Sequence, residues 1–233
     1  MRKKAIKLLG MLIITLLFIP NCVKTTEQSK ENSTSAQKIT ERQMMPFGLV
    51  GKVKTYESKN CYPDGKVYYT HSVDFNRQGQ VIRWVKQHKS KLYKHQLKRK
   101  FDKKGNLRII RVYVNGKFTE KIVMQYNKKK NSYGWKNYKH GKTDYIVTHF
   151  CDKSGKMLKF VISNPNNNKK TIFQHKHNSQ GHIIGYDIFN EKNKLTGKAK
   201  IETDAIGNGI KEIQLTPSDK IKNIVYIKYT YWK

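Results

Sequence analysis

Polar and apolar residues alternate over most of the chain after residue 46. The segments Tyr69–Phe75 and Lys121–Tyr126 carry mainly apolar side chains at every second position, which is the pattern of a strand with one buried face. β-branched and aromatic residues, which favour strands, are frequent in both segments. The pattern predicts an all-β region without an amphipathic helix.

The alternation is interrupted about every 26 residues by the same turn, and a fixed period of this length is typical of repeat architectures. Asn or Asp stands at the second position of every copy, and Gly stands at the fifth position of every copy except the third, which has Lys130. The short polar side chain can bond to the backbone of its own turn, and Gly adopts the left-handed conformation that closes it. Each copy is therefore predicted to be a hairpin tip. The copies start at Phe75, Phe101, Tyr126, Cys151, His177 and Thr203.

A second set of turn-forming residues, such as Asn115-Gly116, lies between these copies. Each repeat is thus two strands, and successive hairpins predict an antiparallel meander of about 14 strands, from Leu49–Ser58 to Ile224–Trp232. Because strands twist, a meander of this length cannot remain flat. The expected fold is a strongly curved sheet or a partly closed barrel or shell.

Two rows of repeat positions are predicted to form apolar ladders across this sheet, because side chains of equal parity on a strand share a face. The first row lies five residues after the Gly position and is interrupted by Glu212. The second row lies three residues after it. The first contains Trp84, Ile110, Trp135, Phe160 and Tyr186, and the second contains Ile82, Arg108, Tyr133, Leu158, Ile184 and Ile210.

The N-terminus has the composition of an export signal. Met1–Lys4 is basic, Ala5–Pro20 is mostly apolar and short for a membrane span, and Cys22 follows. A cysteine at this point resembles a bacterial lipoprotein signal, in which the cysteine is lipidated. The predicted organisation is a signal peptide at 1–21, a polar, flexible tether at 22–46 with lipidated Cys22, and a β-repeat domain at 47–233. A plain signal peptide or an uncleaved anchor is the alternative.

The β-repeat domain has two further cysteines, Cys61 and Cys151. Export would permit a disulfide. In the meander, however, they start turns at opposite edges of the sheet, roughly 25 Å apart and beyond disulfide reach. Both are therefore predicted to be free thiols, unless a closed shell brings the two edges together.

The chain is strongly basic, with 48 Lys and Arg against 16 Asp and Glu and a net charge of +32. Between Val85 and Lys142, 19 Lys or Arg stand against only Asp102 and Glu120, a local balance of 19 − 2 = +17. Such a field attracts polyanions. The alternative is that the abundance of Lys, Asn and Ile reflects a low-GC genome and not a binding surface; charged strand edges also suppress aggregation. The predicted polyanion-binding residues are Lys98, Arg99, Lys100, Lys103, Lys104, Lys128, Lys129 and Lys130.

Export narrows the choice of polyanion. Aromatic residues such as Tyr93 and Tyr113 interleave with the basic residues and would suit nucleic acid, but an exported protein does not normally meet it. The expected partners are anionic glycans, lipopolysaccharide phosphates or lipid headgroups, together with the membrane that holds the N-terminal lipid.

No residues predict a catalytic centre, a metal site or a cofactor. His175 and His177 share a strand face and His149 has the same repeat position as His175, but no Cys, Asp or Glu completes a metal shell. We interpret these histidines as solvent-facing. The acidic residues form no close pair for acid–base catalysis, and neither a Gly-x-Ser-x-Gly nor a phosphate-binding loop is present.

The repeated turn resembles the unit of the RHS or YD-repeat family: an aromatic residue, Asp, two variable residues, Gly and then an apolar residue. Phe101–Leu107 is the best example, and the likeness extends over about residues 47–233. MORN-like repeats of small bacterial proteins are a neighbouring resemblance. The RHS resemblance implies a β-strand scaffold of the kind used for encapsulation and for carbohydrate or surface contacts.

Together these observations predict a non-enzymatic binding or scaffolding lipoprotein of the bacterial cell envelope, on the outer membrane or the cell surface. One alternative is an envelope hydrolase of glycan or peptide, with His175 or His177 in its site. Another is an immunity or chaperone-like partner of a secreted toxin.

Overall fold

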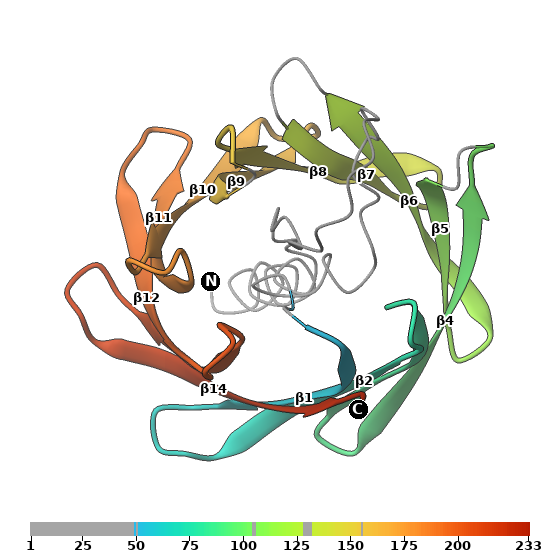
Figure 1. Cartoon of the computed structure of the whole chain (residues 1–233). Coiled ribbons are helices and arrows are strands. Elements are labelled where there is room, and N and C mark those ends of the chain that lie inside the picture. The colour runs from blue at the N-terminus through green and yellow to red at the C-terminus, as the bar shows by residue number, and fades with distance from the viewer. Residues whose placement is uncertain (1–48, 50, 104–105, 128–131, 155) are drawn as a thin grey trace, which may run out of the picture.

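A computed structural model describes residues 49, 51–103, 106–127, 132–154 and 156–233. Fourteen antiparallel strands follow one another as a meander, each paired with its neighbours in the chain (Figure 1). The last strand pairs with the first over eight residue pairs, so the sheet closes into a barrel. The predicted all-β meander is confirmed, and closure is complete rather than partial. It leaves no unpaired sheet edge.

The strands are short and of similar length. They are β1 (Val53–Cys61), β2 (Val67–Phe75), β3 (Val81–His88), β4 (Lys91–Phe101), β5 (Leu107–Val114), β6 (Lys117–Asn127), β7 (Ser132–Lys139), β8 (Lys142–Cys151), β9 (Met157–Asn164), β10 (Lys169–His177), β11 (Ile183–Asn190), β12 (Leu195–Thr203), β13 (Gly209–Leu215) and β14 (Ile221–Tyr231).

The repeated Asn/Asp turns connect even-numbered strands to odd-numbered strands and are built as their chemistry predicts. In the β2–β3 turn, the Gln80 amide donates to the Asn76 side chain at 2.9 Å, and the Gly79 amide donates to the Asn76 carbonyl at 2.9 Å. Gly79 has a φ of 77°, in the left-handed region. In four further copies the side chain at the same position likewise accepts a hydrogen bond from the backbone amide four residues later: Asp102, Asp152, Asn178 and Asp204. The tip of the third copy lies outside the described residues.

All turns from an even to an odd strand lie at the same rim of an up-and-down barrel, which we call the Asx rim. The chain also enters β1 and leaves β14 at this rim, where the Trp232 amide donates to the Lys52 carbonyl at 2.8 Å. Turns at the opposite rim include Asn115-Gly116, with φ values of 48° and 80°. Two consecutive positive φ values are the mark of a tight two-residue hairpin.

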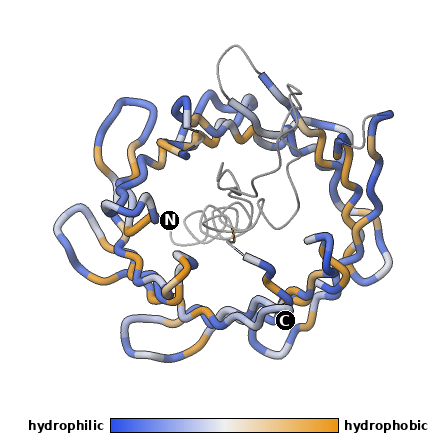
Figure 2. Tube along the Cα trace, in the orientation of Figure 1, coloured by the Kyte–Doolittle hydropathy of each residue, from blue (hydrophilic) through white to orange (hydrophobic). Residues whose placement is uncertain are grey.

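Buried and exposed side chains alternate along the strands, and in a closed barrel of one layer the buried positions face inward. The first predicted ladder is confirmed, since Trp84, Ile110, Trp135, Phe160 and Tyr186 are 0–6% exposed. Rings from the even strands extend it, as where Phe160 stacks on Phe173 at 4.2 Å. Figure 2 shows hydrophilic turns projecting from the ring and apolar residues recurring along the strands.

The second predicted ladder is wrong in five of its six positions, because a β-bulge follows the turn. Phe75 pairs with Val81 and Asp74 pairs with Arg83, which leaves Ile82 as an extra residue, 65% exposed on the outer face. Register shifts of the same kind leave four further members of this row as extra residues of a bulge, namely Arg108, Leu158, Ile184 and Ile210. The β6–β7 pair has no shift, and its Tyr133 is 8% exposed. One extra residue reverses the face that the following side chain occupies.

The cysteines agree only in part with the prediction. Cys61 has a buried, free thiol. Cys151 is disulfide-bonded, so the prediction of a free thiol is wrong there. The distance argument had excluded only a bond between Cys61 and Cys151, and the partner of Cys151 lies outside the described residues.

The predicted signal peptide (1–21) and the tether (22–46), with Cys22, also lie outside the described residues. Within the described part of the chain, no helix has the length and apolar character needed to cross a membrane.

Candidate anion-binding surface

The residues predicted from sequence to bind anions are distributed over both faces of β4. Lys98 and Lys100 are exposed on the outer face, and Lys103 is exposed beside the Asp102 turn. Arg99 instead points inward and donates to the backbone carbonyls of Leu97 and Val81. The structure therefore does not bring Arg99 into the outer surface. Lys104, Lys128, Lys129 and Lys130 lie outside the described residues.

A row of cations, of which the sequence reasoning singled out only Lys98, runs across the outer face of three neighbouring strands. Lys98 on β4 lies directly opposite Arg111 on β5, and Arg111 lies directly opposite Lys121 on β6. Adjacent strands are about 4.8 Å apart, so three positive charges occupy about 10 Å of the barrel wall. We call Lys98, Arg111 and Lys121 the cation row. Like charges placed directly opposite one another destabilise a sheet.

Two tyrosines on the same face border the cation row. Lys98 Nζ lies 5.0 Å from the centre of the Tyr113 ring, and Lys121 Nζ lies 5.2 Å from that of Tyr138. Such cation–π contacts orient the lysine stems and leave the remaining ammonium hydrogens available. No ion pair involves a member of the row within the described part of the chain.

The two acids of this basic region cannot neutralise the row. Asp102 forms a 2.9 Å ion pair with Arg108 at the Asx rim. Glu120 lies on the inner side of β6, where it accepts a 2.9 Å hydrogen bond from the side chain of Asn137. The cation row is therefore a concentrated and unneutralised positive charge.

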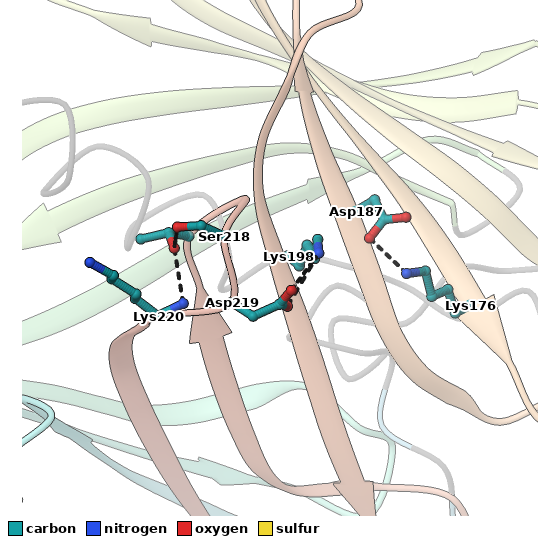
Figure 3. A network of polar contacts seen from close by, with 7 residues as sticks. Lys176, Asp187, Lys198, Ser218, Asp219 and Lys220 are labelled. Carbon is teal, nitrogen blue, oxygen red and sulfur yellow. Dashed lines mark hydrogen bonds and ion pairs between the residues drawn. The ribbon is translucent and has the colours of Figure 1, made fainter.

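Cations on the opposite wall of the barrel are arranged differently. Lys176 pairs with Asp187 at 2.7 Å and Lys198 pairs with Asp219 at 2.9 Å (Figure 3). Lys211 pairs with Glu202 at 2.8 Å. Local acids neutralise these three lysines, whereas no ion pair among the described residues involves a member of the cation row.

The interpretation of the histidines as solvent-facing is wrong for His149 and His175. They are 0% and 8% exposed, on the same inward parity as Phe160 and Tyr186. Burial lowers the pKa of His175 to about 3, and the neighbouring His177 contributes to the shift. No cluster of three or more potential metal ligands occurs among the described residues.

The inner face also carries one buried carboxylate, Glu212, at the position that interrupts the aromatic ladder. It accepts 2.6 Å hydrogen bonds from the Tyr186 hydroxyl and the Gln214 amide, and burial raises its pKa. The His175 ring centre lies 6.2 Å from that of Tyr186, and neither of the His175 ring nitrogens has a hydrogen-bond partner. No hydrogen bond joins His175 to Glu212 among the described residues, so the two do not form an acid–base pair.

Comparison with known proteins adds little at the level of sequence. No protein-family model matches the chain, and no curated protein matches its sequence. Two solved structures are similar to it in fold: a porin-like protein from Bacteroides uniformis, and a protein from Bacteroides fragilis described as exported and as having a YmcC-like fold. Each is 8% identical and covers 76% of this chain, with TM-scores of 0.35 and 0.29 and coverage of 96% and 97% of their own chains. Similarity at this level carries no argument about function.

Proposed function

We propose that this protein is an exported, non-enzymatic binding module of the bacterial cell envelope, and that its outer wall binds anionic glycans. The cation row is the observation that carries the proposal. Lys98, Arg111 and Lys121 face one another across three strands without an acid, an arrangement that is unfavourable until an anion neutralises it.

The shape of the row favours an extended ligand. It runs across the strands, around the barrel wall, and its members lie on neighbouring strands about 4.8 Å apart. A linear chain with closely spaced sulfate, phosphate or carboxylate groups would meet all three cations in sequence. A membrane surface carrying anionic lipid headgroups is the other source of such groups, and the experiment below separates the two.

The outer wall is a water-accessible surface in this sector. Strands that face lipid carry apolar residues on their outer side. Here the outer positions of β4 carry Lys94, Gln96, Lys98 and Lys100, and Arg111 on β5 is exposed between the buried residues Ile110 and Val112. This arrangement supports binding of a soluble or surface-displayed polyanion.

The proposal is tested by binding of the full-length protein to immobilised heparin and to lipopolysaccharide at increasing salt. The triple variant Lys98→Gln/Arg111→Gln/Lys121→Gln should bind roughly tenfold or more weakly at physiological ionic strength, because each lost cation removes a counterion-releasing contact. The matched control is Lys176→Gln/Lys198→Gln/Lys211→Gln. It removes the same charge from the opposite wall of the barrel, where acids pair with these lysines, and it should bind nearly as the wild type. Equal losses in both variants would show a nonspecific effect of net charge and would overturn the proposal.

A second arm compares the heparin result with flotation on vesicles that contain anionic lipid, using the Cys22→Ser variant so that a lipid anchor does not contribute. Loss of heparin binding with unchanged flotation in the cation-row variant supports a glycan ligand. The reverse result would assign the row to lipid headgroups. Incorporation of radiolabelled palmitate that disappears in Cys22→Ser would test the predicted lipid anchor, which requires a cysteine sulfur that is not engaged in a disulfide.

A further inference from the structure

The inner face of β2, β3 and β4 contains a second group of basic side chains, separate from the cation row. His71 on β2 lies directly opposite Lys86 on β3, and Trp84 on β3 lies directly opposite His95 on β4. His71 is 2% exposed and Lys86 is 6% exposed. The Trp84 ring lies 4.2 Å from His95 and 5.8 Å from His71, centre to centre. We call His71, Trp84, Lys86 and His95 the Lys86 cluster.

Polar atoms of this cluster are buried without partners. Both ring nitrogens of His71 and both of His95 lack hydrogen bonds, as does the hydroxyl of the adjacent Tyr69. A buried polar atom without a partner is destabilising, and in a native structure it calls for an explanation such as a bound ion or ligand. Burial lowers the pKa of His95 to about 3 and that of His71 well below its usual value, so both rings are neutral and each offers one N–H donor.

Lys86 lacks a counter-ion. Its ammonium lies 4.5 Å from the centre of the Trp84 ring, and no ion pair or hydrogen bond involves it within the described part of the chain. Burial lowers the pKa of Lys86 to about 7, and Glu120 acts against this shift by its charge alone, since it bonds to Asn137. A buried ammonium is normally paired or hydrogen-bonded.

The missing partner is therefore an acceptor with negative charge. The titratable groups that face Lys86 from the three strands include Tyr93, which lies directly opposite it on β4, together with His71, His95 and Tyr69. All of these can donate a hydrogen bond. An ionised carboxylate or phosphate offers only acceptors and carries the charge that Lys86 lacks. We propose that the Lys86 cluster is a binding site for a single oxyanionic group, with Lys86 supplying the charge and His71, His95 and Tyr69 supplying hydrogen-bond donors.

This site is independent of the proposed glycan surface. The cation row points outward from β4–β6, whereas the cluster points inward from β2–β4, so substitutions at one leave the other in place. The two proposals can therefore fail separately. To exclude the outer surface, the tests below use full-length protein that carries Lys98→Gln/Arg111→Gln/Lys121→Gln.

The first measurement is thermal unfolding in sodium phosphate, sodium acetate and sodium chloride at equal ionic strength. Phosphate, acetate or both should raise the melting temperature above that in chloride, since an anion that binds only the folded state stabilises it. Which of the two anions acts distinguishes a phosphate site from a carboxylate site. Lys86→Met should abolish the difference, and Lys86→Arg, which keeps the charge, should retain part of it. No difference between the salts, or an equal difference in Lys86→Met, would refute the proposal.

The second measurement is specific to the residue and needs only the conservative variant Lys86→Arg for assignment. Lysines are ¹³C-dimethylated by reductive methylation, and their methyl resonances are titrated by NMR with and without the anion that stabilises the protein. The resonance that is absent in Lys86→Arg identifies Lys86. Its pKa should rise by about one unit when the anion binds, because an opposite charge favours the ammonium. An unchanged Lys86 titration would exclude the site even if the melting temperature had shifted.

Discussion

Tyr186 and Glu212 occupy the same position in consecutive repeats, 26 residues apart, and the Tyr186 hydroxyl donates a 2.6 Å hydrogen bond to the Glu212 carboxylate. Tyr186 is 0% exposed and Glu212 is 3% exposed. Glu212, which interrupts the apolar ladder, thus provides the acceptor that the buried Tyr186 hydroxyl of the preceding repeat needs.

Removal of that acceptor should destabilise the barrel. We expect Glu212→Ala to lower the free energy of unfolding by about 1–3 kcal/mol, since the Tyr186 hydroxyl would remain buried without a partner. Glu212→Gln keeps an acceptor oxygen and should be milder. Urea unfolding followed by tryptophan fluorescence measures both. If the double variant Tyr186→Phe/Glu212→Ala is no more stable than Glu212→Ala, the bond is not the cause.

The buried imidazoles should make the protein sensitive to acid. Burial lowers the pKa of His175 to about 3 in the folded chain, whereas the unfolded chain protonates histidine near 6.5. The unfolded state therefore binds more protons between these values, and stability is lost as the pH falls from about 6.5 toward 3. Each such group contributes up to about 1.4 kcal/mol per pH unit. Glu212 contributes with the opposite sign, because its raised pKa removes stability as the pH rises.

Unfolding free energies at several values between pH 4 and 8 test this dependence. His175→Phe should show a smaller loss on acidification than the wild type. His88→Gln is the control, because His88 is an exposed histidine at the end of β3. A wild-type protein that is equally stable throughout the range would contradict the burial of these rings.

The β-bulges lead to a prediction about Ile82 that is opposite to the one the repeat pattern alone would give. Ile82 and Trp84 have the same parity in the sequence, yet Ile82 is 65% exposed and Trp84 is 6% exposed. Ile82→Ala should change the free energy of unfolding by no more than about 0.5 kcal/mol, whereas Trp84→Ala should cost about 3–5 kcal/mol. Equal costs would place both side chains in the core and argue against the bulge.

The Asx turns should depend on two local features. Gly181 has a φ of 83° and no atom near the position of an added Cβ, so Gly181→Ala tests backbone conformation alone. We expect a loss of about 1 kcal/mol, with Gly181→Asn milder because Asn tolerates this region. Asn178→Ala should cost about 1 kcal/mol by removing the 2.9 Å bond from the His182 amide. Thermal unfolding of the three variants would measure these effects, and a Gly181→Asn variant less stable than Gly181→Ala would contradict the assigned conformation.

Local chemistry made much of this fold predictable from the sequence. The bond from Gln80 to Asn76 joins residues only four apart, so the turn, and with it the number and direction of the strands, is encoded within each repeat. The inward ladder from Trp84 to Tyr186 follows from the same period, because every repeat presents the same parity after its turn.

Contacts between distant residues decided the rest. Closure depends on partners such as Thr55 and Thr230, which lie 175 residues apart and share a 2.7 Å hydrogen bond, and no periodic pattern specifies that pairing. The bulges then determine which residues face inward, so that Ile82 is exposed while Lys86 is buried. Closure and register also decide whether a cation faces inward or outward. They determine as well whether a neighbouring strand brings an acid alongside it. The repeat therefore encodes the strands, while closure and register decide what each face of the barrel can bind.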